Sequence, residues 1–209
     1  MKKIFLLLLL TGGTFTTFAQ KLSIGFRGGV DLGTITGSAQ GSSSSNTSNV
    51  HLSSIFAGYV DYQKNNLSLQ PAVILVGKGG NINIGDGGEG KFALHYLEVP
   101  INLVYHLPLR IGDVYFGGGP YLAFGTGGTV VVQAEGVYDS QPATFGGYGD
   151  FSRTDAGFEI IGGIRVADNV VFHLNYDFGL SNIINITGQE GGLGTLKTGS
   201  FGISFGFVF

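Results

Sequence analysis

Hydrophobic residues alternate with small or polar ones along residues 196–209. Phe201, Ile203, Phe205, Phe207 and Phe209 take every second position, and serine, glycine or valine lies between them. Successive side chains of a β-strand point to opposite faces, so this segment presents one aromatic and aliphatic face and one face of small groups. Such a pattern is typical of a strand that contacts lipid on one side only.

The same period of two recurs in seven earlier segments. It predicts further strands at residues 22–32, 56–62, 67–78, 97–106, 114–124, 155–166 and 170–178. The connections alternate between long polar stretches (residues 37–50, 79–90, 126–151 and 182–194) and tight turns (residues 63–66, 107–112 and 167–169). The predicted fold class is therefore all-β, a closed antiparallel transmembrane β-barrel of eight strands.

The third long connection leaves an alternative open. It contains a β-branched run at residues 130–132, which predicts either a hairpin that extends beyond the membrane or two additional strands in a ten-stranded barrel. Bacterial outer-membrane barrels have short periplasmic turns and longer extracellular loops. Both termini of the mature chain are therefore expected to face the periplasm.

Residues 1–19 have the features of a secretory signal peptide. Lys2 and Lys3 precede an apolar run at residues 4–10, and Ala19 ends a segment suited to cleavage. The barrel domain is expected to occupy residues 20–209 and to lie in the outer membrane. The apolar run is far shorter than the roughly 20 residues that cross a bilayer as a helix, so we expect insertion by strands.

The composition supports a membrane barrel. Charged residues make up only 12% of the chain, and 38 of its 209 residues are glycine, whereas ordinary soluble domains have about 25% charged residues and about 7% glycine. The net charge of −3 argues against a nucleic-acid partner, which would require a basic patch. The chain contains no cysteine, so no disulfide framework is expected.

Four segments carry a resemblance to a known family. They are HYLEVPINLVY at residues 95–105, GGGPY at 117–121, DAGF at 155–158 and LNYDFGLSN at 174–182. Together they make residues 21–209 similar to the PorT-like outer-membrane β-barrel family. The resemblance implies an eight-stranded barrel and little about activity, although the family's namesake is associated with a secretion system. The terminal residue Phe209 and the apolar residues before it also resemble the signal that the barrel-assembly machinery recognises.

Charged side chains fall on the predicted inward face of the barrel. They are Arg27, Lys78 and Arg165 together with Asp31, Asp61, Glu98, Glu159 and Asp177, and His106 and His173 lie near the periplasmic end. The interior of an eight-stranded barrel is only wide enough for side chains to fill it. We therefore expect a hydrogen-bonded ionic plug, because an unpaired charge in that space costs several kcal/mol. A narrow ion path or proton relay is the alternative.

No catalytic frame surrounds the histidines, and the protein is not expected to be an enzyme. The pairs that could act are His51 with Ser53 and His95 with Glu98. No cofactor or metal is predicted, and the loop acids Asp86, Glu89, Asp139 and Asp150 are expected to be solvated rather than to bind Ca²⁺.

The function expected is that of a monomeric barrel with a structural or surface-interaction role. Its expected partners are outer-membrane lipid, the barrel-assembly machinery and an unidentified surface ligand or envelope protein. A narrow porin for small solutes or ions is one alternative. An accessory of secretion or envelope biogenesis is another.

Overall fold

A computed structural model describes residues 20–39, 45–47, 49–83, 89–134, 137–146, 150–167, 169–184 and 193–209. This description leaves out the predicted signal peptide, Asp86 and parts of the long connections. Glu89 is described for its backbone but not for its side chain. No helix in the described part is both long and apolar enough to cross a membrane.

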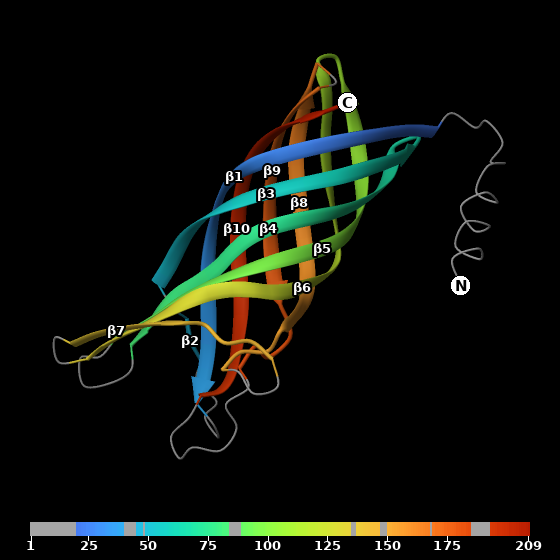
Figure 1. The fold of residues 1–209 in the computed structure, drawn as a ribbon. Helices are drawn as coiled ribbons and strands as arrows, with labels where there is room; N and C mark the ends of the chain where they lie inside the picture. Colours follow the sequence, from blue (N-terminus) through green and yellow to red (C-terminus); the bar gives the residue numbers. More distant parts are fainter. Residues whose placement is uncertain are drawn as a thin grey trace, which may run out of the picture.

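Eight long strands form a closed antiparallel barrel (Figure 1). They are β1 (Gln20–Ala39), β3 (Asn49–Lys64), β4 (Leu67–Asn83), β5 (Glu89–Leu109), β6 (Gly112–Ala134), β8 (Thr154–Val166), β9 (Val170–Gly179) and β10 (Leu193–Val208). Each pairs with the next, and β10 pairs with β1 from Gly25 opposite Val208 to Ala39 opposite Leu193. Closure removes the free edges of the sheet, and the predicted eight-stranded barrel is confirmed.

Two short strands lie outside the barrel wall. β2 (Ser45–Thr47) pairs with β1, and β7 (Val137–Pro142) pairs with the far end of β6. The run at residues 130–132 therefore extends the β5–β6 hairpin beyond the barrel. The ten-stranded alternative is wrong.

The two ends of the barrel differ. Tight turns at residues 65–66 and 110–111, and the turn residues Ala167 and Asn169, form one end, called here the turn end. Asn65 adopts a φ of 55° there, a left-handed conformation that asparagine tolerates better than most residues. The start of β1 and the C-terminus lie at the same end (Figure 1), since Gln20 pairs with Lys64. The opposite end, with the long connections, is called the loop end.

Side chains alternate between the outside and the inside as the period of two predicts. On β9, Phe172 is 55% exposed and Leu174 46% exposed, whereas His173 is 3% exposed and Asp177 1% exposed. The predicted lipid-facing residues Phe201, Ile203, Phe205 and Phe207 likewise lie on the outer face of β10. The outer face is thus an apolar belt, and buried side chains fill the inside.

Tyrosine rings lie over glycine on the neighbouring strand inside the barrel. Tyr59 is paired with Gly25, and a Cβ atom on Gly25 would lie 2.2 Å from the tyrosine ring. Tyr115 lies over Gly163 in the same way. A bare backbone is therefore needed at these positions for the rings to fill the narrow interior.

The interior is not polar throughout. An apolar cap closes its loop-end part, where Ile55, Ile74, Leu94 and Tyr96 are almost fully buried. Phe145, Phe151 and Ile183, which belong to the long connections, pack on the same cluster, and the ring of Phe145 meets Tyr96 edge-on at 6.0 Å. The prediction of polar connections at residues 126–151 and 182–194 is thus wrong for these three residues.

Candidate functional site

The buried polar residues of the interior form the candidate site. Each predicted network residue has its side chain inside the barrel and is at most 7% exposed: Arg27, Asp31, Asp61, Lys78, Glu98, Glu159, Arg165, His173 and Asp177. Most of the buried charged residues, together with His106, form two groups along the barrel axis. The central cluster contains Lys78, Glu98, Asp155, Glu159 and Asp177, and the turn-end cluster contains Asp61, His106, Asp113 and Arg165.

Lys78 is the main cation of the central cluster. Its Nζ lies 2.6 Å from Glu98 Oε2 and 3.5 Å from Asp155 Oδ2, and it lies 4.3 Å from the centre of the Tyr121 ring. The lysine is fully buried, so it must be compensated by these short contacts. Charge-assisted hydrogen bonds and contact with the face of an aromatic ring both stabilise a buried ammonium.

Asp155 connects the central cluster to the loop end. Its carboxylate accepts hydrogen bonds from the hydroxyl groups of Ser181 (2.6 Å), Thr198 (2.7 Å) and Tyr121 (3.4 Å). Ser181 lies two residues before Ile183, which belongs to the apolar cap. Asp155 therefore links β8 and β10 with the segment that forms the apolar cap.

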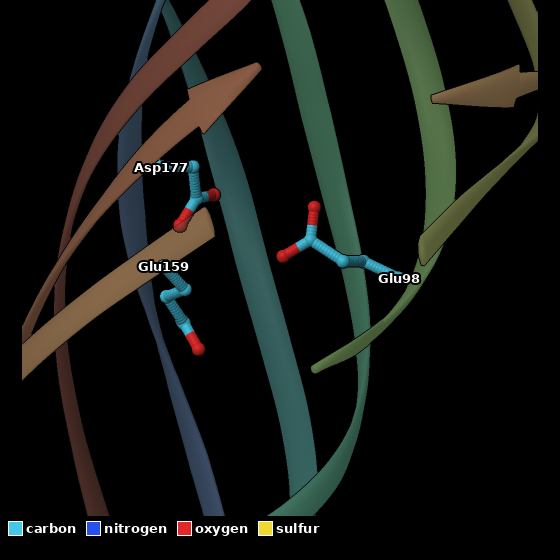
Figure 2. Close-up of side chains that lie close together, drawn as sticks. All are labelled: Glu98, Glu159 and Asp177. Carbon is cyan, nitrogen blue, oxygen red and sulfur yellow. The ribbon is translucent and has the colours of Figure 1, made fainter. Parts of the chain in front are cut away.

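Three carboxylates meet at the centre of the barrel. Glu159 and Asp177 are paired on β8 and β9, and Glu98 reaches towards them from β5 (Figure 2). Each offers an oxygen, and these oxygens all lie within 4.8 Å of one another. Asp177 accepts hydrogen bonds from Ser200 (2.9 Å) and Asn175 (3.3 Å), and Glu159 accepts one from Asn102. These three acids are called the carboxylate trio.

Of the remaining predicted residues, Arg27 and Asp31 lie beside the trio, whereas His173 lies next to the turn-end cluster. Arg27 places Nη2 3.9 Å from Glu159 Oε1 and lies over the Tyr59 ring at 5.9 Å. Asp31 is fully buried and interacts electrostatically with Asp177 and Lys78. His173 bonds through Nδ1 to the hydroxyl of Tyr115 at 2.9 Å, so it joins the aromatic packing rather than an ion pair.

Arg165 organises the turn-end cluster. Its Nε donates to Asp113 Oδ1 at 2.6 Å, and Nη1 lies 3.6 Å from Asp61 Oδ2. His106 Nδ1 meets the other oxygen of Asp113 at 2.7 Å. Asp113 lies opposite Arg165 in the pairing of β6 with β8, a register that alternation alone does not predict, so its role was missed in the sequence.

An open vestibule of about 760 Å³ leads from the turn end to this cluster. His106, Asp113 and Arg165 line it together with residues of the three tight turns. Behind them the gap lined by Arg27, Tyr59 and His173 holds only about 10 Å³, which is at most the space of one water molecule. The turn-end cluster is therefore the floor of the vestibule.

Acids outnumber bases in the interior. Seven carboxylates are buried in the described part of the chain, against the three cations Arg27, Lys78 and Arg165. The carboxylates are Asp31, Asp61, Glu98, Asp113, Asp155, Glu159 and Asp177. Two like charges about 5 Å apart repel by about 3 kcal/mol at an effective dielectric constant of about 20. Ion pairs between these side chains alone therefore leave negative charge uncompensated.

The structure does not bring together the two histidine pairs considered from the sequence. Ser53 donates its hydroxyl hydrogen bond to the carbonyl oxygen of Gly77 (2.6 Å). His95 is exposed while Glu98 is buried, so these two side chains lie on opposite faces of β5.

A serine–histidine–aspartate arrangement occurs elsewhere. Ser68 Oγ lies 2.9 Å from His106 Nε2, and His106 Nδ1 meets Asp113. An ionised carboxylate only accepts hydrogen bonds, so Nδ1 of His106 donates to Asp113 and Nε2 faces the hydroxyl of Ser68. The residues lie on β4, β5 and β6, and Ser68 precedes His106 by 38 residues, so no short sequence motif contains all three.

A family model described as outer membrane protein beta-barrel domain matches residues 18–185. The chain belongs to this outer-membrane β-barrel family. It is therefore an outer-membrane protein that crosses the bilayer through its strands, with the apolar belt against lipid. No curated protein is similar enough in sequence to match the chain.

Several solved structures are similar to this β-barrel at low sequence identity. Ail, the attachment invasion locus protein of Yersinia pestis, is 13% identical, with a TM-score of 0.49 over 90% of this chain and 98% of that chain. Neisserial surface protein A is 13% identical (TM-score 0.46, 91% and 98% covered). OprG from Pseudomonas aeruginosa is 11% identical (TM-score 0.47, 90% and 95% covered).

The contacts of Arg165 generate a prediction for the stability of the outer-membrane β-barrel. Arg165→Ala leaves Asp113 and Asp61 buried without their cation, so it should lower the free energy of unfolding by about 3–5 kcal/mol. Ile160→Ala, on the lipid face of the same strand, removes only apolar contact and should cost about 2 kcal/mol or less. Urea unfolding in detergent micelles measures both values. Equal losses would contradict the ionic floor described above.

Proposed function

We propose that this protein is a closed outer-membrane barrel that acts as a structural and surface-interaction protein rather than as a channel. The observation that carries the proposal is the filled interior. From the turn end, the vestibule stops at His106, Asp113 and Arg165, and the gap directly behind them holds about 10 Å³. From the loop end, Phe151 and Ile183 are buried in the apolar cap. A solute that crossed the barrel would have to displace both the floor of the vestibule and the apolar cap.

We propose that the loop end faces the outside of the cell and that both mature termini face the periplasm. The short turns and long connections support this orientation, because bacterial outer-membrane barrels have short periplasmic turns. The signal-peptide pattern at residues 1–19 supports export. The β5–β6 hairpin and β7 then extend into the medium, where they offer the surface for a ligand or an envelope partner.

The proposed state is a monomer. Closure of β10 onto β1 satisfies the strand edges within one chain. The outward series of β10 that ends at Phe209 supports recognition by the barrel-assembly machinery, through its resemblance to the terminal signal of such barrels.

A narrow porin is the second candidate, and the vestibule favours it. An opening of about 760 Å³ reaches His106, Asp113 and Arg165 from the turn end and would become a path if the floor and the cap moved. An accessory role in secretion rests on the PorT-like resemblance alone, and co-purification of an envelope complex from native membranes would test it.

We propose that the protein is not an enzyme, in spite of Ser68, His106 and Asp113. A nucleophilic serine must be reached by its substrate. Ser68 is 2% exposed and lines neither the vestibule nor the gap behind it. Arg165 also pairs with Asp113, which fits a structural floor. Labelling of Ser68 in the folded protein by a fluorophosphonate probe would contradict this proposal.

A planar bilayer tests the closed interior. The purified mature chain should insert without stepwise conductance, because the floor and the cap both block the axis. Circular dichroism and protection from added protease establish that the inserted protein is folded. Discrete, reproducible openings of the wild-type chain would favour the narrow porin.

Cysteine labelling tests the orientation, and the absence of native cysteine makes the labels unambiguous. Ser140→Cys, on β7, should react with a membrane-impermeant maleimide in intact cells. Arg110→Cys, in a tight turn, should react only after the outer membrane is permeabilised. Both side chains are exposed, so they serve as matched controls for each other. The reverse pattern would place the long connections in the periplasm.

A further inference from the structure

The carboxylate trio and its surroundings have the chemistry of a metal site. We propose that Glu98, Glu159 and Asp177 hold a hard divalent cation, Ca²⁺, inside the barrel. The inference builds on the filled interior proposed above, but calcium content and conductance are measured separately, so either proposal can fail alone.

The spacing of the trio suits Ca²⁺. Its oxygens lie within 4.8 Å of one another. Calcium binds oxygen ligands at about 2.3–2.6 Å, so two ligands on opposite sides of the ion are about 4.6–5.2 Å apart. The three acids come from both walls of the barrel, with Glu98 facing Glu159 and Asp177 (Figure 2), so one ion would touch all of them.

A buried amide next to the trio has an oxygen without a hydrogen-bond donor among the described residues. Asn102 is 2% exposed and is held at the site by the bond from its Nδ2 to Glu159 Oε2. Its Oδ1 accepts no hydrogen bond from any described residue, and neither does Glu159 Oε1. Buried oxygens without donors are costly, and amide and carboxylate oxygens are the ligands that Ca²⁺ prefers.

The charges of the central region also favour a cation. Asp31 and Asp155 lie near the trio, and the bases there are Lys78 and Arg27. Lys78 is shared between Glu98 and Asp155, and Arg27 is 3.9 Å from Glu159. Among the described residues, Asp177 accepts hydrogen bonds from the neutral groups of Ser200 and Asn175 and forms no direct ion pair. A divalent ion would remove most of the remaining negative charge, and carboxylate oxygens that already accept one hydrogen bond keep a second lone pair for it.

Calcium content after folding tests the proposal. The mature chain is folded into detergent micelles with about 1 mM Ca²⁺, which is at the upper end of the dissociation constants of extracellular calcium modules. The bound metal is then measured by equilibrium dialysis and mass spectrometry. One calcium per chain is expected. Protons shared among the acids are the competing explanation, and they predict no bound calcium.

Three variants locate the ion. Asp177→Asn and Glu159→Gln should each weaken calcium binding at least tenfold. Asp61→Asn, the control, removes a buried acid that pairs with Arg165 outside the trio and should bind calcium as the wild type does. Binding that is equal in all variants would assign the ion to the loops and overturn the proposal.

Unfolding provides a second measurement that needs no variant. The wild-type midpoint of thermal unfolding should be higher in Ca²⁺ than in chelator, because an ion that binds only the folded chain stabilises it. This comparison also decides the question if Asp177→Asn and Glu159→Gln fail to fold. An unchanged midpoint, together with no bound calcium, overturns the site.

Discussion

The narrow interior of an eight-stranded barrel is the constraint on which the rest of this structure depends. Eight strands enclose a space only wide enough for side chains to fill it, so inward charged groups must pair with one another on neighbouring strands or across the interior. Lys78 meets Glu98 and Asp155, and Arg165 meets Asp113 and Asp61. Tyrosine rings occupy the room left by glycine. The charge and the size of each inward side chain must therefore match those of its neighbours, whereas an outward side chain needs only to be apolar.

The same constraint explains why the two ends are closed by different chemistry. At the turn end the connections are too short to fold inwards, and ionic side chains of the strands close the floor. At the loop end the connections are long enough to return, and Phe151 and Ile183 bury themselves in the apolar cap. The acid-rich central cluster lies between these ends, which is why its excess charge has no simple access to water.

The sequence predicts which face of a strand each residue occupies, because this depends only on the period of two. It does not predict which residues of neighbouring strands lie opposite each other. Alternation identifies Lys78, Glu98 and Asp177 as inward residues, because parity along a strand decides the face. It cannot show that Asp113 lies opposite Arg165, or that Ser68 reaches His106, since strand pairing brings these residues together. Phe145, Phe151 and Ile183 lie in connections without any period, so their burial had no signal in the pattern.

Amine labelling of the folded wild-type chain tests the filled interior most directly. A small acylating reagent enters any water-filled channel, and mass spectrometry reports the modification of each lysine. Among the described residues, Lys21, Lys64, Lys91 and Lys197 are exposed, whereas Lys78 is fully buried. The account predicts rapid modification of these four exposed lysines and none at Lys78 until the barrel unfolds. Modification of Lys78 at a rate similar to theirs would contradict it.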